Sequence, residues 1–258
     1  MSRIEATFKA LNRPALITFI MAGDPDAKTS LDVLKALPEA GADIIELGMP
    51  FTDPMADGPT IQLAGQRALK SGANMKQTLQ MVRDFRKGNN TTPIVLMGYF
   101  NPILQYGVEK FMNDASAAGV DGLIIVDLPP EEAGKAQEIA KTNNLDIIRL
   151  LTPTTTMGRL PKILEGASGF LYYVSITGVT GAAQADLNKI KPHIEQIKTH
   201  TDLPIAIGFG IKTPQDAAQM AALGDAIVVG SSIVQTIAEK RDASAVSEQV
   251  KALSDALS

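Results

Sequence analysis

Short runs of apolar residues recur along this chain, and the stretches between them carry apolar residues at helical spacing. The runs occupy residues 15–21, 44–47, 94–97, 123–126, 147–151, 170–174, 205–207 and 226–229. The helical patterns include residues 28–40, 74–87, 131–142, 187–199 and 214–223. Strands that are apolar on both faces, each followed by a helix, are typical of a parallel sheet built from βα units. The pattern therefore predicts a parallel α/β fold.

The number of runs favours a closed barrel over an open sheet. Eight runs in 258 residues give about 32 residues per unit, which fits a (β/α)8 TIM barrel. No low-complexity tract or charge run divides the chain, so residues 1–258 are predicted as a single barrel domain with an extra N-terminal helix. A doubly wound open sheet is the alternative. It would carry a Gly-rich motif in the first βα turn, and the AGDP of residues 22–25 does not match GxGxxG.

Composition and charge exclude several classes of partner. The net charge is −4 without a basic cluster, which argues against nucleic acid and anionic membranes as partners. The absence of cysteine excludes disulfides, thiolate metal sites and cysteine nucleophiles. Charged residues at positions 5, 9 and 13 interrupt the N-terminus, so it lacks a signal-peptide core, and no apolar run approaches the ~18 residues of a membrane span. A soluble cytoplasmic protein is expected.

The segment ELGMPFTDPMADGPTIQ, residues 46–62, holds the most informative polar residues. Glu46, Asp53 and Asp57 lie at a strand end and in a loop broken by Pro and Gly. Buried carboxylates cost free energy unless they are paired or used. The structural alternative is that Glu46 pairs with Arg67 and that Asp57 only forms a turn before Gly58. Asp53, which precedes a proline, is as consistent with bracing the loop as with reacting.

Other polar residues and glycines also follow the apolar runs, on the barrel face where active sites lie. Asp24 and Asp127 are expected to cap helix N-termini. Three glycine-bearing loops, at residues 178–181, 208–210 and 230–232, follow the last three strands. Main-chain N–H groups in such loops and at helix N-termini bind phosphate, and barrels place such a site after strands 7 and 8. A phosphate site is therefore predicted there.

The residues that are missing from the strand ends narrow the chemistry. His193 and His200 fall in a helical region away from every predicted strand end, which argues against imidazole catalysis and a histidine metal site. No predicted strand carries an interior lysine, which disfavours Schiff-base aldolases. Carboxylate acid/base chemistry on a small phosphorylated substrate remains.

The motifs as a set resemble one family over nearly the whole chain. ELGMPFTDPMADGPTIQ, together with FIMAGDP, VLMGYFNP, LIIVDLP, SITGVTGA, GFGI and VVGSSIV, is similar to the α subunit of tryptophan synthase. The resemblance implies a TIM barrel that cleaves indole-3-glycerol phosphate to indole and glyceraldehyde 3-phosphate, with no metal and no cofactor. It also implies an αββα complex with a β subunit, which alone would hold pyridoxal phosphate.

The resemblance assigns site residues. Glu46 and Asp57 take the catalytic positions, and Thr180 would close over the substrate and touch Asp57. The phosphate would be held by Gly181, Gly210, Gly230 and Ser231. The indole pocket would be lined by Phe19, Met97, Tyr99, Ile124, Val126, Tyr172, Phe209 and Val228.

The chemistry fits these residue types. Cleavage requires protonation of indole C3 and removal of a proton from the glycerol hydroxyl, while positive charge develops at the ring nitrogen. We assign the proton transfers to Glu46, whose pKa burial should raise toward neutrality, and the ring nitrogen to Asp57.

Three alternatives stay open. One is another barrel enzyme on a phosphorylated indole or ribose precursor, such as an isomerase or the synthase of the preceding step, which would need lysines at strand ends. Another is a non-catalytic phosphate-ligand-binding barrel. The third is a stand-alone indole-producing lyase that uses the same residues.

Overall fold

A computed structural model describes residues 1–174, 187–208 and 210–257. Its centre is a nine-stranded sheet in which every paired neighbour is parallel. The strands are β1 (Ala15–Met21), β2 (Ile44–Gly48), β3 (Ile94–Gly98), β4 (Gly122–Ile125), β5 (Asp146–Ile147), β6 (Arg149–Leu151), β7 (Leu171–Val174), β8 (Ile205–Gly208) and β9 (Ala226–Val229). Seven of the eight predicted runs each coincide with one strand, and the run at residues 147–151 covers both β5 and β6.

The sheet curls into a nearly closed barrel. The strand order is β5-β4-β3-β2-β1-β9-β8-β7-β6, so the last strand pairs with the first. The two ends of the sheet, β5 and β6, are separated in the chain only by Ile148. The run predicted as one strand over residues 147–151 is therefore split, because its first part pairs with β4 and its second part with β7. The TIM barrel is confirmed, and the doubly wound alternative is wrong.

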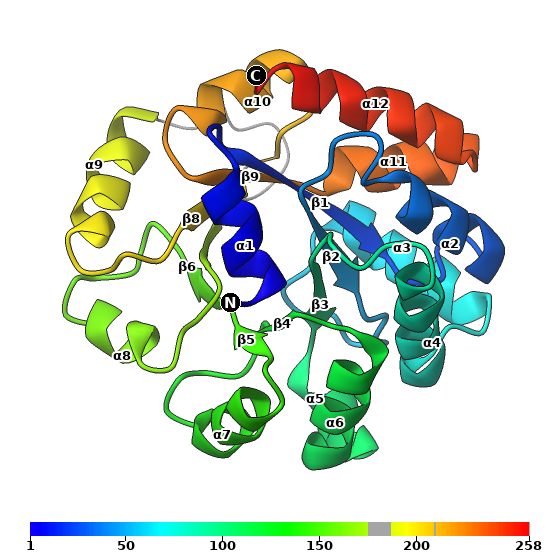
Figure 1. Ribbon diagram of the computed structural model, residues 1–258, viewed down its shortest axis with the longest axis horizontal. Helices are drawn as coiled ribbons and strands as arrows, with labels where there is room; N and C mark the ends of the chain where they lie inside the picture. Colours follow the sequence, from blue (N-terminus) through cyan, green and yellow to red (C-terminus); the bar gives the residue numbers. More distant parts are fainter. Residues whose placement is uncertain (175–186, 209, 258) are drawn as a thin grey trace.

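Helices surround the barrel, as Figure 1 shows. They are α1 (Arg3–Ala10), α2 (Ala27–Ala36), α3 (Pro59–Lys70), α4 (Met75–Arg86), α5 (Phe100–Tyr106), α6 (Val108–Ala118), α7 (Gly134–Thr142), α8 (Leu160–Leu164), α9 (Leu187–Lys198), α10 (Pro214–Ala221), α11 (Ser231–Lys240) and α12 (Ala243–Asp255). The five predicted helices correspond to α2, α4, α7, α9 and α10. The predicted N-terminal helix corresponds to α1.

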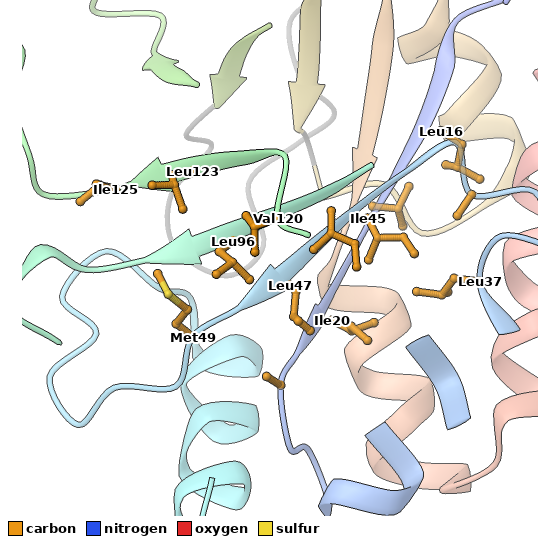
Figure 2. Close-up of a cluster of buried hydrophobic side chains, with 14 of the residues drawn as sticks. Leu16, Ile20, Leu37, Ile45, Leu47, Met49, Leu96, Val120, Leu123 and Ile125 are labelled. Carbon is orange, nitrogen blue, oxygen red and sulfur yellow. The ribbon is translucent and has the colours of Figure 1, made fainter. Parts of the chain in front are cut away.

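Two apolar layers hold the barrel together. Side chains that point outward from the strands, such as Leu16, Ile45 and Leu96, pack beneath the helices (Figure 2). Inward-pointing side chains, such as Ile17 and Val95, fill the barrel itself and make it a packed core. Ile4 of α1 belongs to this inner cluster, so α1 covers one end of the barrel (Figure 1). The opposite end of the barrel is therefore available for a functional site.

Asp121 ties three segments together near the start of β4. The carboxylate of Asp121 accepts hydrogen bonds from Arg3 at 2.8 Å, from Arg86 at 2.7 Å and from the backbone N–H of Ile94 at 2.8 Å. Its side chain is 5% exposed and that of Arg86 is 9% exposed. Burial lowers the pKa of Arg86 to about 10, and the charge of Asp121 opposes this effect. The ion pair therefore compensates a cation that the fold has removed from water.

We expect Asp121→Ala to lower the free energy of unfolding by about 3–5 kcal/mol, because it leaves the buried Arg86 without its partner. Urea denaturation measures the change. Asp84→Ala removes the partner of the exposed Lys87 and is the matched control, with a much smaller expected loss. Equal losses in the two variants would contradict the role given to Asp121.

Candidate active site

A cavity of about 250 Å³ opens at the carboxyl ends of the strands, opposite α1. It is lined by most of the residues that the sequence singled out. These are Phe19, Glu46, Asp57, Met97, Tyr99, Val126, Tyr172, Gly210, Val228, Gly230 and Ser231. The barrel therefore brings both predicted catalytic carboxylates to one cavity.

Glu46 is the most unusual side chain of this cavity. It lies in the middle of β2, in register with Phe19 of β1 and Val95 of β3. The side chain is fully buried, and neither carboxylate oxygen has a hydrogen-bond partner among the described residues. Burial without a partner raises the pKa of Glu46 from 4.5 to about 8. A carboxyl group with such a pKa can both give and accept a proton near neutral pH.

Asp57 has a different environment. It is half-buried in the loop between β2 and α3, just before the helix N-cap Gly58. Its Oδ1 accepts a hydrogen bond from the hydroxyl of Tyr99 at 2.8 Å. Burial raises the pKa of Asp57, and the hydrogen bond from Tyr99 opposes that rise. The two carboxylates of the cavity therefore differ in hydrogen bonding.

Aromatic rings and glycines shape the cavity together. A Cβ atom at Gly48 would lie 2.7 Å from the Phe19 ring, and one at Gly208 would lie 2.4 Å from the Tyr172 hydroxyl. Any larger residue at either position would displace a ring. Burial, and secondly the charge of Glu46, raise the pKa of Tyr172 well above its ordinary value. Tyr172 is therefore close enough to Glu46 to sense its ionisation.

The rim on the side of β8 and β9 offers main-chain donors. Gly230 is the N-cap of α11, and Ser231 is the first residue of that helix. The first turn of α11 has no acidic residue. The first N–H groups of a helix have no partner within the helix and attract anions. Gly210 has a φ of +51°, a conformation that favours glycine. These three residues surround a place where an anionic group could bind.

Some predicted residues lie elsewhere. Ile124 packs in the inner barrel cluster and is not among the cavity-lining residues. Val126, two residues further along the same face, does line the cavity, so Ile124 lies deeper in the barrel than Val126. Thr180, Gly181 and Phe209 lie outside the described residues.

The structural alternative for Glu46 is wrong. Arg67 forms a two-pronged ion pair with Asp24 at 2.7 and 2.8 Å, and not with Glu46. Asp24 is consequently not a helix cap, and Asp26 caps α2 in its place. Because Arg67 pairs with Asp24, Glu46 remains unpaired among the described residues.

The remaining loop acids do not line the cavity. Asp127 accepts a hydrogen bond from the backbone N–H of Phe100, the first residue of α5, at 2.7 Å. Asp127 therefore satisfies the N-terminus of a helix, as expected. The helix is α5, which follows β3, whereas Asp127 itself follows β4. Asp53 is exposed and accepts a hydrogen bond from Thr52, which suits a loop brace.

Several cavity residues were not expected from the sequence. Met21, Gly48 and Val174 each lie two positions after a predicted residue of the same strand. Side chains two apart in a strand share a face, so this alternation could have identified them. Met49 and Ile61 had no comparable signal, because they enter the cavity from a loop and from α3.

Histidine and metal chemistry find no support in the described part of the chain. His193 donates a hydrogen bond from its Nε2–H to the Thr155 carbonyl and bonds through Nδ1 to the Tyr173 hydroxyl, both at 2.9 Å, and it does not line the cavity. Within residues 1–174, 187–208 and 210–257, no cluster of three His, Cys, Asp or Glu side chains suits a metal ion. In the same ranges, no helix has the length and apolar character needed to span a bilayer.

A parallel barrel with carboxylates in a cavity at the carboxyl ends of its strands has the arrangement of a TIM-barrel enzyme. A family model described as tryptophan synthase alpha chain matches residues 6–257. The chain therefore belongs to the tryptophan synthase alpha chain family.

Solved structures agree with this assignment. Tryptophan synthase subunit alpha from Legionella pneumophila str. Paris is 41% identical, with a TM-score of 0.92 over 100% of this chain and 98% of that chain. A chain from Aquifex aeolicus VF5 is 37% identical, with a TM-score of 0.92 over 100% of this chain and 99% of that one. A chain of Mycobacterium tuberculosis tryptophan synthase, in an aminoacrylate-bound form, is 33% identical, with a TM-score of 0.90 over 100% of both chains.

Family membership gives the activity. The protein is a lyase of the α reaction, the cleavage of indole-3-glycerol phosphate in tryptophan biosynthesis. Which residues carry that reaction is a separate question, which the geometry of the cavity addresses.

The unpaired burial of Glu46 has a consequence for stability. Between pH 4.5 and about pH 8 the folded protein keeps a proton that the unfolded chain releases. The wild type should therefore lose stability as pH rises through this range, by up to about 1.4 kcal/mol per pH unit. Glu46→Gln has no such proton. Its stability relative to the wild type should increase up to about pH 8 and then level off.

Urea unfolding between pH 5 and 9 measures this difference. Glu248→Gln makes the same chemical change on the exposed surface of α12 and should keep the wild-type pH dependence. A difference between Glu46→Gln and wild type that stays constant with pH would show that Glu46 does not hold its proton in the folded state.

Proposed function

We propose that the cavity is the site of the α reaction, with Glu46 transferring protons and Asp57 stabilising the charge on the indole ring. The observation that carries this proposal is Glu46 itself, which is fully buried in β2 with no partner for either oxygen among the described residues. An unpaired buried carboxyl group destabilises a fold, so its presence at a cavity supports a functional role.

The reaction begins with the proton on Glu46. Transfer of this proton to indole C3 converts the ring to an indolenine cation, with positive charge at the nitrogen. The Glu46 carboxylate that results then removes the proton from the hydroxyl on the neighbouring glycerol carbon. The carbon–carbon bond breaks, its electron pair returns to the ring, and indole and glyceraldehyde 3-phosphate form. Glu46 ends with a proton, ready for the next turnover.

Asp57 stabilises the intermediate. A carboxylate beside the ring N–H opposes the positive charge that develops after protonation of C3. The hydrogen bond from Tyr99 favours the ionised form of Asp57, in contrast to Glu46, which has no donor. Two carboxyl groups in different environments can have different ionisation states at the same pH, one protonated and one negatively charged.

The rim formed by Gly210, Gly230 and Ser231 is the proposed phosphate site. The support is the unpaired N–H groups of the first turn of α11 and the absence of acidic residues there. Gly181 would complete the site from the segment outside the described residues. Phe19, Met97, Val126, Tyr172 and Val228, with Phe209, would enclose the indole ring.

The scheme uses only side chains and main-chain groups of this chain, so we propose that the α reaction needs no cofactor. Pyridoxal phosphate would belong to the partner β subunit. A phosphate ester does not cross membranes unaided, which supports a cytoplasmic location.

We propose a β subunit as the macromolecular partner, in an α2β2 complex that receives indole directly. Four large hydrophobic side chains of the described residues are strongly exposed, and three of them follow β2 or β3: Met55, Leu63 and Leu104. Met55 directly precedes Ala56 and Asp57, which line the cavity, and Leu63 lies in α3, which contributes Ile61 to it. Apolar side chains around a site support docking of a partner there.

The catalytic roles are tested with indole-3-glycerol phosphate as substrate and indole as the measured product. Glu46→Gln and Asp57→Asn should each lower kcat by about 10²-fold to 10⁴-fold, because each removes a group that acts in the transition state, while substrate binding remains. Asp127→Asn, at the same barrel end but outside the cavity, is the control and should retain turnover. Unchanged turnover in Glu46→Gln would favour a non-catalytic binding barrel.

The partner is tested by co-purification with a β subunit and by the lyase rate of the mixture. Leu104→Lys places a charge at the proposed contact and should weaken co-purification about ten-fold or more. Thr142→Lys, at the end of α7 far from the cavity, should not. A β subunit that neither co-purifies with the wild type nor raises its lyase rate would indicate a stand-alone lyase.

A further inference from the structure

Tyr99 connects two parts of the cavity that are distant in sequence. It follows β3 directly, is the N-cap of α5 and is 3% exposed. Its hydroxyl donates a hydrogen bond to Asp57 Oδ1 at 2.8 Å and accepts one from the backbone N–H of Ala56 at 3.0 Å. One hydroxyl group at the end of β3 therefore binds two successive residues of the loop that carries Asp57.

The two bonds fix the direction of the hydroxyl proton. A phenol has one proton to donate, and the N–H of Ala56 can only donate. The proton of Tyr99 therefore points to Asp57, and the bond is one from a neutral donor to a carboxylate, which is stronger than a bond between neutral groups. The ring of Phe51, whose centroid is 5.6 Å from that of Tyr99, packs beside it and helps to hold it in place.

The second oxygen of Asp57 is left for another donor. Within the described ranges, Oδ2 has no hydrogen-bond partner, and Asp57 lines the cavity. A carboxylate held by one oxygen has a fixed orientation, so its other oxygen presents a defined acceptor to a ligand.

We propose that Tyr99 is a positioning residue for the α reaction, which holds Asp57 by Oδ1 so that Oδ2 meets the ring N–H of the substrate. This inference rests on the role proposed above for Asp57. It adds that Asp57 depends on Tyr99 for both its orientation and its ionisation.

The electrostatic part follows from the groups that face Asp57. Burial raises its pKa, and the hydrogen bond from Tyr99 is the effect that opposes this rise. The other titratable side chains that line the cavity are Glu46 of β2 and Tyr172 of β7, and neither bonds to Asp57. Burial also raises the pKa of Tyr99, so its hydroxyl stays a donor throughout the working range. Without that hydroxyl, Asp57 should take up a proton at higher pH than in the wild type.

Tyr99→Phe is the test, because it removes the hydroxyl and keeps the ring that packs on Phe51. Its control is Tyr106→Phe, which removes a hydroxyl that donates to Asp114 at 2.6 Å, away from the cavity. Carbon-13 labelling of aspartate carboxyl groups allows the titration of Asp57 to be followed by NMR. The resonance of Asp57 is identified by its absence from the spectrum of Asp57→Asn.

In Tyr99→Phe the pKa of Asp57 should rise and kcat for indole-3-glycerol phosphate should fall by about 10-fold to 100-fold, with a smaller change in KM. Tyr106→Phe should change neither. In the Asp57→Asn background, Tyr99→Phe should cause little further loss, because both changes remove the same interaction.

An unchanged titration of Asp57 in Tyr99→Phe, or a kcat equal to that of the wild type, would overturn the inference. Equal losses from Tyr99→Phe in the presence and absence of the Asp57 carboxylate would also overturn it, since Tyr99 would then act by another route. Full turnover in Asp57→Asn is a different result. It would refute the role proposed for Asp57 itself, and this inference would fall with it.

Discussion

The removal of Glu46 from water is the constraint on which the site depends. Its neighbours in the sheet, Phe19 and Val95, are apolar, and no described residue gives it a hydrogen bond. The free-energy cost of ionising such a group appears as a pKa of about 8. That cost can persist only because the rest of β2 is buried and apolar and holds the strand in place. The stability of the barrel core thus maintains the reactivity of one side chain.

The shape of the cavity and the pKa of Glu46 have a common origin. Gly48 and Gly208 leave room for the rings of Phe19 and Tyr172, and a Cβ at either position would collide with a ring. Both rings line the cavity and lie near Glu46, so they contribute to the burial that raises its pKa. In the proposed function, the indole ring packs against these rings, so the same side chains would both bind the substrate and keep Glu46 protonated.

The sequence predicted what depends on local pattern, and it missed what depends on contacts between distant segments. Apolar runs located the strands, and with them Glu46, because burial on both faces leaves a continuous apolar run. The break at Ile148 carries no such signal, since it arises where the two ends of the sheet meet. Arg67 pairs with Asp24, 43 residues away, and Tyr99 binds Asp57 across 42 residues. Ile124 packs in the barrel core and Val126 lines the cavity, a difference that residue type alone does not give.

The contrast between the two carboxylates sets the order of the proposed steps. Asp57 has a donor on one oxygen, which favours its anion, whereas Glu46 has none, which favours its acid. Burial alone accounts for the raised pKa of Glu46. In the proposed mechanism, the resting site holds one proton, on Glu46, and one negative charge, on Asp57. Protonation of indole C3 must come first, because Glu46 becomes a base only after it has given up its proton. The negative charge that Glu46 then carries is compensated by the indolenine cation beside Asp57.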